Sequence, residues 1–563
     1  MFTVLLIKVR QTQRSTSKYC TEHSTLLFSH PKPVGHCPSV IHHSPYAVPD
    51  FSVVKGEHAT TAMNSTIIRK WHQNLVSDGC IEGHGCVEYT LSSKLSNRTR
   101  TVLSPAAMRR VKLHDAVKTH GARCLDGSPA VYYARRATAL ANRSRFVVYF
   151  QAGGWCFASS WSRTVKACTA RMLGRMGSTT GYPESLDDPD SVLSGIFDND
   201  GQIGGILSPI PEVNPDFASW TAVWIAYCDG GSFSGNRSEP IDIGQNRSLW
   251  FRGRSIVHAV VEDLAAKYGM GNATDVLLAG SSSGGLAAMM HADYVRSQLP
   301  PDVRFGVLSD SGWFRPSYSL DRTRYTERMR TLYWTMQSVS DAGCEAAMGE
   351  ADRWKCIFAP NVFPHVGSRV FVLEAAYDAW QLLNILGIDC STYGQSLCAC
   401  TVEDMHAINA YGSAARLSIL EALNSTAHHA TSSGALVSAC ILHGQAVNVL
   451  GTRSWDLRAG GTSPRDSVRA WFFAAGGRAS GPMSEEEGAS RTGGVANELL
   501  ANRTGHDDSS SERVRDEFSS GAFTADDAWT ELAPATMDSV PPITIEKCSS
   551  FPCNPRCLQE CAY

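Results

Sequence analysis

The sequence predicts an α/β fold in which helices cover both faces of a mostly parallel β-sheet and disulfides stabilise the domain. Two observations lead to this prediction. Short apolar runs with the composition of buried strands alternate along the chain with segments of helical spacing, an order typical of parallel strands joined by crossover helices. The chain also contains eighteen cysteines, an even number, and this count is high for a protein of a reducing compartment.

Each element follows from a local pattern. A short helix is expected over 106–117, and a hairpin near 124–133, where Asp-Gly and Ser-Pro pairs signal a turn. Runs rich in β-branched and aromatic residues predict strands, whereas apolar residues three or four positions apart predict helices. The strands are expected over 146–150, 221–227, 275–279, 303–308, 369–374 and 435–442, and the longer helices over 253–268 and 464–474. Ser463 is suited to the N-cap of the last helix and Pro464 to its first position.

Composition divides the chain into parts. Residues 1–100 show no sustained strand or helix period and are rich in Ser, Thr, His and Lys, so we expect an N-terminal extension that is disordered or partly cleaved. Residues 101–475 and 522–563 are expected to form one domain. Between them, residues 476–521 are rich in Gly, Ser, Glu, Asp and Arg, and this predicts a low-complexity insertion.

Charge and hydrophobicity exclude several classes of function. The formal net charge is -3 and the hydrophobic fraction is 43%, so nothing in the balance of charge indicates binding to nucleic acid or to a membrane surface. No run of 18 or more apolar residues occurs, and we therefore expect no membrane-spanning segment.

Potential glycosylation sites and cysteines together predict a secreted protein or one of the secretory lumen. Lys8 and Arg10 directly follow an apolar start of seven residues, so an export signal there would be atypical. The eight Asn-x-Ser/Thr sequons lie at Asn64, Asn97, Asn142, Asn236, Asn246, Asn272, Asn424 and Asn502.

The central motif is Gly280-Ser281-Ser282-Ser283-Gly284, between the apolar run from Asp275 and a segment of small and apolar residues. A strand followed by Gly-x-Ser-x-Gly and then by a helix predicts a nucleophile elbow, which presents Ser282 at a sharp turn. The alternative is an ordinary Ser/Gly-rich loop. Upstream, the strand over 146–150 runs into Gly153-Gly154-Trp155, where backbone N–H groups near Gly154 and Trp155 are expected to complete an oxyanion hole.

A serine nucleophile needs a general base and an orienting carboxylate, and in α/β-hydrolases these follow the serine in the order acid, then histidine. Asp310 and Asp378 both follow predicted strands. We favour Asp378 as the acid and expect Asp310 to cap or support the loop after its own strand. Among the histidines downstream, His443 directly follows a buried strand-like run, which favours it as the base over His406, His428, His429 and His506.

Several motifs occur together in an order that resembles the pectin acetylesterase family, which also includes the Notum carboxylesterases. The motifs are Cys124-Leu125-Asp126-Gly127-Ser128-Pro129, Gly153-Gly154-Trp155-Cys156, Asn214-Pro215-Asp216-Phe217, Tyr227-Cys228-Asp229-Gly230, Ser232-Phe233-Ser234-Gly235, the Gly280–Gly284 elbow, Ser309-Asp310-Ser311-Gly312, Tyr377-Asp378-Ala379-Trp380-Gln381 and Phe551-Pro552-Cys553-Asn554-Pro555-Arg556-Cys557.

The resemblance implies an α/β-hydrolase with a triad of Ser282, Asp378 and His443, and an oxyanion hole formed by the N–H groups of Gly154, Trp155 and Ser283. The Trp380-Gln381 pair and the cysteine-rich tail are closer to plant-type pectin acetylesterases than to Notum. Three features depart from the family. Gln151-Ala152 stands where members usually carry Glu and Gly, Gly444 follows His443 where plant-type members usually have Cys, and the N-terminal extension has no counterpart.

The hypothesis is therefore a serine carboxylesterase that removes O-acetyl groups from a polysaccharide such as pectin. We expect a monomer with no cofactor and no metal; the cysteines at 548, 553, 557 and 561 are interpreted as disulfides rather than as a zinc site. Two alternatives stay open. One is a Notum-like deacylase of lipidated protein, which needs an apolar acyl pocket, and the other is an inactive secreted binding protein on the same fold.

Overall fold

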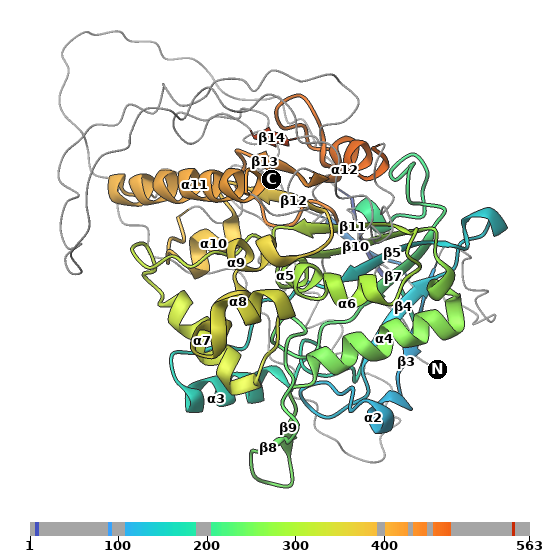
Figure 1. Ribbon diagram of the computed structural model, residues 1–563, viewed down its shortest axis with the longest axis horizontal. Helices are drawn as coiled ribbons and strands as arrows, with labels where there is room; N and C mark the ends of the chain where they lie inside the picture. The colour runs from blue at the N-terminus through green and yellow to red at the C-terminus, as the bar shows by residue number, and fades with distance from the viewer. Residues whose placement is uncertain are drawn as a thin grey trace, which may run out of the picture. The chain divides into compact units, whose positions relative to one another are not determined.

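The computed structural model describes residues 6–10, 88–92, 107–186, 204–390, 400–425, 432–447, 454–474 and 543–545. The chain divides into two compact units, Met1–Val102 and Leu103–Tyr563. In the first unit, β1 (Leu6–Arg10) pairs antiparallel with β2 (Glu88–Ser92), and neither strand was expected from the sequence. The second unit contains the large sheet and every helix of the described residues (Figure 1).

The large sheet has ten strands in the order β14-β13-β12-β11-β10-β5-β7-β4-β3-β6. The strands from β14 to β7 are parallel, whereas β4, β3 and β6 continue the sheet antiparallel. The strands of this sheet are β3 (Met108–Lys112), β4 (Val131–Arg135), β5 (Arg145–Phe150), β6 (Ser185–Leu186), β7 (Thr221–Ile225), β10 (Asp275–Ser281), β11 (Arg304–Asp310), β12 (Val370–Ala375), β13 (Gly434–Ser438) and β14 (Ile543–Ile545). A separate hairpin joins β8 (Ile241–Asp242) and β9 (Ser248–Leu249).

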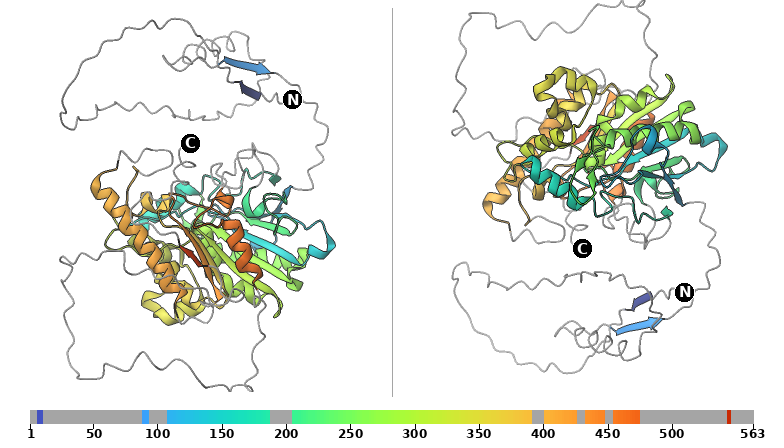
Figure 2. Two further views of the ribbon diagram at one scale, coloured as in Figure 1. Left: turned by 90° about the horizontal axis from the view of Figure 1, so that it is seen from above. Right: turned by 90° about the horizontal axis from the view of Figure 1, so that it is seen from below.

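Helices cover both faces of the sheet, as the sequence predicts (Figures 1 and 2). The helices are α2 (Ala116–Thr119), α3 (Trp161–Arg171), α4 (Gly253–Tyr268), α5 (Ser283–Met290), α6 (Ala292–Ser297), α7 (Tyr325–Met336), α8 (Ala342–Asp352), α9 (Ala359–Val362), α10 (Ala379–Asn384), α11 (Val402–Leu423) and α12 (Pro464–Phe473). Short 3-10 helices are η1 (Leu140–Asn142), η2 (Gly205–Leu207), η3 (Met270–Asn272), η4 (Arg353–Ile357), η5 (Phe363–His365) and η8 (Ser454–Asp456).

Alternate residues of the central strands belong to two hydrophobic cores. In β5, Phe146 and Val148 point into the larger core with residues of α4, α5 and α11, whereas Val147 and Tyr149 point into the smaller core with α12. This alternation follows from the two-residue repeat of a strand and explains why the run over 146–150 is apolar throughout. A strand buried on both faces is the pattern on which the fold prediction rests.

One predicted element is wrong. The expected helix over 106–117 is instead the strand β3, followed by the single helical turn α2. Ala-Ala-Met-Arg-Arg has good helix propensity, but β3 lies between β4 and β6 and forms ladders with both. Met108 is fully buried and Val111 packs against the larger core, so sheet pairing and burial outweigh the weak local preference.

The strand expected over 435–442 is found as β13 but ends at Ser438, so His443 does not directly follow it. Other boundaries agree more closely with expectation. The helix over 253–268 is found as α4, and its C-cap is Gly269 at φ 76°. In α12 the side chain of Ser463 accepts a hydrogen bond from the N–H of Asp466 at 3.1 Å, as the N-cap prediction requires. The expected hairpin near 124–133 is a tight turn with a single bridge between Arg123 and Pro129, and the strand after it pairs with β3 and β7.

Four disulfides lie within the described residues: Cys124–Cys228, Cys156–Cys168, Cys344–Cys356 and Cys390–Cys400. They confirm the expectation of structural disulfides. The first closes a loop of more than one hundred residues, and such long loops lose the most unfolded-state entropy in the chain-entropy model. None of the described helices is long and apolar enough for a membrane span.

The smaller core predicts a strong effect of one side chain. Trp471 is fully buried, packs against Phe371 at 5.4 Å between ring centroids, and lies 2.7 Å from where a Cβ on Gly306 would stand. Trp471→Ala should lower the free energy of unfolding by about 3–5 kcal/mol because it leaves a cavity. Urea denaturation with the disulfides intact measures this, and Trp334→Ala, at a side chain 39% exposed, should change stability far less. Equal losses would contradict this account of the core.

Candidate active site

The elbow lies where β10 ends at Ser281 and α5 begins at Ser283. Ser282 has φ 57° and ψ −126°, a conformation that non-glycine residues rarely adopt and that is found at strained functional turns. Two glycines permit the turn. A Cβ on Gly280 would stand 2.2 Å from the carbonyl oxygen of Gly284, and one on Gly284 would stand 2.3 Å from that of Phe150. The Gly-x-Ser-x-Gly spacing therefore reflects close approach of three backbone segments.

Asp378 follows β12 and is the N-cap of α10. One carboxylate oxygen accepts a hydrogen bond from the N–H of Gln381 at 2.8 Å, and the other lies 2.7 Å from Nδ1 of His443. The structure thus brings the proposed acid and the proposed base into direct contact. Because an ionised carboxylate only accepts hydrogen bonds, Nδ1–H of His443 is the donor and Nε2 is left as the basic nitrogen.

His443 lies in the loop after β13, with 14% of its side chain exposed. Burial acts to lower its pKa, but the charge of Asp378 and the hydrogen bond to it act in the opposite direction, and the net effect raises the pKa above 6.5. The indole of Trp380 stacks on the imidazole at 6.1 Å between centroids. The planes of the indole and the imidazole differ by 27°. The imidazole is therefore held by the indole on one face as well as by the hydrogen bond through Nδ1.

Asp310 connects the elbow with the histidine loop. Its main-chain carbonyl accepts the N–H of Ser282 at 2.7 Å, and its carboxylate accepts the hydroxyl of Ser281 at 2.8 Å. The same carboxylate accepts the N–H groups of Gln445 at 2.8 Å and Ala446 at 3.0 Å. Complete burial raises the pKa of Asp310 to about 6, although these hydrogen bonds oppose the shift. Asp310 therefore supports the site. Its carboxylate accepts the Ser311 hydroxyl at 3.4 Å in the loop after its own strand, as expected, and its shorter bonds also hold the loop that carries His443.

Of the other histidines considered as the base, only His406 lies within the described residues. His406 lies on an exposed face of α11. His428, His429 and His506 lie outside the described residues, as does the tail with the cysteines at 548, 553, 557 and 561. Among the described residues, no cluster of three or more His, Cys, Asp or Glu side chains has the arrangement of a metal site.

Hydrogen bonds from Tyr227 and to Ser232 hold the segment after β5. Gly154 has φ 59°, a conformation that favours glycine. Its carbonyl accepts the hydroxyl of Tyr227 at 2.6 Å, and that hydroxyl in turn accepts the N–H of Ser232 at 2.9 Å. The indole N–H of Trp155 donates to the Ser232 hydroxyl at 2.8 Å. These bonds hold the peptide between Gly154 and Trp155 and the indole of Trp155.

The N–H groups that are predicted to bind an oxyanion are those of Gly154, Trp155 and Ser283. The hydrogen bonds found within the described residues include none donated by the backbone of Gly154, Trp155 or Ser283. Ser283 is the first residue of α5, so its N–H has no acceptor within the helix and lies at the positive end of the helix dipole. A developing negative charge on a substrate carbonyl is the partner that such groups suit.

Gln151 shows how one departure from the family pattern is accommodated. Its amide oxygen accepts the N–H of Tyr227 at 2.7 Å inside the protein. An amide supplies the same acceptor as a carboxylate, without a buried charge. The contact holds Tyr227, whose hydroxyl orients Gly154.

Sequence reasoning missed the supporting residues Tyr227 and Ser232 and the way in which Asp310 holds the histidine loop. Tyr227 and Ser232 occur in motifs that the resemblance identified, but their contacts cross between separate segments. The only local signal for Asp310 was its place after a strand. Its partners Gln445 and Ala446 are 135 and 136 residues away, which no local pattern can indicate.

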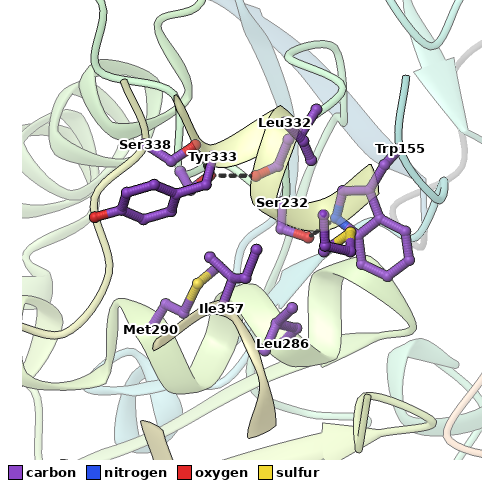
Figure 3. Close-up of a pocket in the computed structure, with 11 residues that line it drawn as sticks. Trp155, Ser232, Leu286, Met290, Leu332, Tyr333, Ser338 and Ile357 are labelled. Carbon is purple, nitrogen blue, oxygen red and sulfur yellow. Dashed lines mark hydrogen bonds between the residues drawn. The ribbon is translucent and has the colours of Figure 1, made fainter. Parts of the chain in front are cut away.

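A small cavity lies beside Trp155 (Figure 3). Apolar side chains of α5, α7 and η4 form most of its wall, and Ser232, Ser234 and Ser338 add polar atoms. Its volume is about 10 Å³, which is room for about one water molecule. The apolar lining residues are Trp155, Leu286, Met290, Met329, Leu332, Tyr333 and Ile357.

The elbow predicts a sharp response to one methyl group. Gly280→Ala should lower the free energy of unfolding by about 1–3 kcal/mol or more, because the added Cβ meets the Gly284 carbonyl. Thermal or urea unfolding measures the change. Gly271→Ala is a matched control, since its Cβ would have Ala265 as nearest neighbour at 4.0 Å. If both variants were equally stable, the close packing at the elbow would be refuted.

Known proteins resemble this chain over its second unit. A model of the family described as Pectinacetylesterase matches residues 104–480. Pectin acetylesterase 5 of Arabidopsis thaliana is 29% identical over 433 residues, which cover 72% of this chain and 92% of that protein. Pectin acetylesterase 11 of the same plant is 30% identical, over 66% of this chain and 89% of its own length.

Notum proteins are also similar, over shorter stretches. The palmitoleoyl-protein carboxylesterase NOTUM of Drosophila melanogaster is 28% identical over 274 residues, which cover 46% of this chain and 36% of that protein. A solved structure described as the Wnt deacylase Notum from Drosophila has 25% sequence identity and a TM-score of 0.50. The likeness covers 65% of this chain and 92% of that one, and it confirms the α/β-hydrolase-like fold.

Proposed function

The chain belongs to the pectinacetylesterase family, and from that premise we propose that it is a serine carboxylesterase that removes O-acetyl groups from acetylated pectin. In this proposal Ser282 is the nucleophile, His443 the general base and Asp378 the orienting carboxylate. The N–H groups of Gly154, Trp155 and Ser283 bind the oxyanion.

A single set of contacts carries the assignment of residues. Ser282 and His443 lie in loops that both bind to Asp310, the first through its carbonyl and the second through its carboxylate. His443 is bonded to Asp378 at 2.7 Å. The strands that precede these three residues, β10, β13 and β12, end at the same edge of the parallel part of the sheet, where α/β enzymes place their sites.

The first half of the reaction acylates the enzyme. Nε2 of His443 takes the proton of Ser282 as Oγ bonds to the acetyl carbonyl carbon, and the carbonyl electrons move to its oxygen. The backbone donors hold that oxyanion, while Asp378 stabilises the imidazolium. When the tetrahedral intermediate collapses, the sugar oxygen leaves with the proton from Nε2, and an acetyl-serine ester stays on Ser282.

The second half releases acetate by the same route. Water gives its proton to Nε2 of His443 and attacks the acetyl-serine carbonyl, and the oxyanion is held by the same N–H groups. Collapse returns the proton to Ser282 Oγ and frees acetic acid. One oxyanion donor is typically worth on the order of 100- to 1000-fold in rate, so three convergent donors supply a large part of the catalysis.

One finding favours acetylated pectin over a lipidated protein as the substrate. The pectin acetylesterases align over most of their own length, whereas the Drosophila NOTUM aligns over 36% of its length. Deacylation of a lipidated protein is the competing outcome of the test below.

We also propose that the catalytic domain comprises residues 101–475 and 522–563, that the protein acts as a monomer, and that it is exported through the secretory pathway. The pairing of β14 with β13 supports the return of the chain to the domain after the insertion. Four disulfides support an oxidising compartment.

The assignment of the nucleophile has a direct test. Ser282→Ala should lower kcat for p-nitrophenyl acetate and for acetate release from acetylated pectin by a factor on the order of a million, because no other group can take up the acyl group. Ser162→Ala, at an exposed serine of α3, is the control and should match the wild type. Equal turnover by Ser282→Ala and wild type would refute the proposal. A preference of the wild type for a palmitoleoylated peptide would replace it with the deacylase.

The Asp378–His443 contact predicts a pH dependence. The base must be neutral, so kcat/KM should fall as pH drops through the raised pKa of His443, which places the acid limb above pH 6.5. Asp378→Asn removes the charge that raises this pKa. The limb should then move to lower pH while kcat falls about 10,000-fold. A pH profile of the variant with an unmoved limb would show that Asp378 does not act on the base.

A further inference from the structure

Trp380 lies beside the triad and has no role in the mechanism above. It is the second residue of α10, two positions after Asp378. Its indole stacks on His443, and a Cβ built on Gly154 would stand 3.8 Å from its ring atom Cζ2. The indole therefore packs on the base and lies beside Gly154 of the segment that is proposed to bind the oxyanion.

Three further rings pack against Trp380 and form an aromatic wall. Trp380 has centroid distances of 5.3 Å to Trp155, 5.5 Å to Phe314 and 6.3 Å to Tyr325. These three partners are buried, with exposures of 7%, 0% and 0%, whereas Trp380 is only partly buried. In the aromatic wall of Trp155, Phe314, Tyr325 and Trp380, the last is the partly exposed member, and it is the one that stacks on His443.

Beyond the wall the protein is apolar but filled. Trp155 has one side on Trp380 and another on the cavity of about 10 Å³ lined by Leu286, Met290 and Ile357 (Figure 3). A chain of methylene groups would find suitable chemistry there but no room. The indole of Trp380 packs against both Trp155 of this filled region and the imidazole of His443.

We propose that Trp380 is the residue that restricts the enzyme to short acyl groups, because its indole fills the space that the methylene chain of a longer acyl group would need. The inference rests on the proposed function, since it takes Ser282 as the point of acyl attachment. It goes beyond that function by naming what selects acetyl over fatty acyl esters.

The stacking on His443 offers a different role, in which Trp380 only orients the base. The two roles differ in what truncation does. Loss of orientation lowers the rate of hydrolysis of all esters by the same factor, because proton transfer to His443 is common to their reactions. Loss of a steric barrier changes the ratio between esters, because only the longer acyl groups gain contacts in the vacated space.

The experiment compares kcat/KM for p-nitrophenyl acetate, butyrate and octanoate in wild type, Trp380→Ala and Trp380→Phe. In Trp380→Ala the octanoate-to-acetate ratio should rise at least 100-fold, since even one methylene in an apolar pocket is worth about 10- to 200-fold. Trp380→Phe keeps an aromatic ring of smaller size and should give an intermediate ratio. It also keeps the test valid if the alanine variant does not fold, which thermal melting would show.

Two controls separate the possible failures. Trp334→Ala removes an exposed indole that contacts Tyr333 and Arg353 but no member of the wall, so its ratio should equal that of the wild type. Ser282→Ala must abolish hydrolysis of every ester, and if it does not, the proposed function fails before Trp380 is judged. The role of Trp380 in selectivity is overturned if Ser282→Ala is inactive but both Trp380 variants keep the wild-type octanoate-to-acetate ratio. A fall of kcat/KM by the same factor for all esters is such a result.

Discussion

A buried carboxylate at the end of β11 holds the active site together. Asp310 accepts the N–H of Ser282 through its main-chain carbonyl and the N–H groups of Gln445 and Ala446 through its side chain. Its complete burial raises its pKa to about 6. Burial thus disfavours the ionised carboxylate, although the ionised form is the better acceptor for these N–H donors. A buried carboxylate lowers stability unless it receives hydrogen bonds, and Asp310 receives them from two separate loops. This requirement constrains where the two loops lie. It fixes the distance between a turn after β10 and a loop after β13, which otherwise share no backbone pairing.

Two backbone segments of the proposed site adopt conformations that are uncommon in folded proteins. Ser282 is held in an uncommon backbone conformation by the packing of Gly280 and Gly284 against neighbouring carbonyl oxygens, and Gly154 adopts a positive φ. Hydrogen bonds of Tyr227 and of the Trp155 indole hold the second segment. In the proposed mechanism this bracing orients the oxyanion donors before substrate arrives, which is the condition under which hydrogen bonds to an oxyanion accelerate a reaction most.

The sequence was sufficient for those parts of the structure that depend on local pattern. The parallel strands are buried on both faces and read as apolar runs, and α4 and α12 have clear spacing and caps, so their predictions are confirmed. The segment that became β3 was predicted as a helix because its composition favours one, and only pairing with β4 and β6 decides otherwise. At the site, chain order suggested Ser282, Asp378 and His443, and those assignments stay predictions. The bracing by Asp310 and the packing of Trp380 could not be predicted, since their partners lie in distant segments of the chain.

The central claim is that Ser282, His443 and the three backbone donors surround one reacting carbon. A crystal structure of the protein after reaction with an organophosphonate tests it most directly. The account predicts phosphorus bonded to Oγ of Ser282, a phosphonyl oxygen about 2.7–3.1 Å from the N–H groups of Gly154, Trp155 and Ser283, and Nε2 of His443 within about 3.2 Å of Ser282 Oγ or of the phosphonate oxygen in the leaving-group position. A phosphonate attached to another residue, or an imidazole out of hydrogen-bond reach of both oxygens, would contradict it.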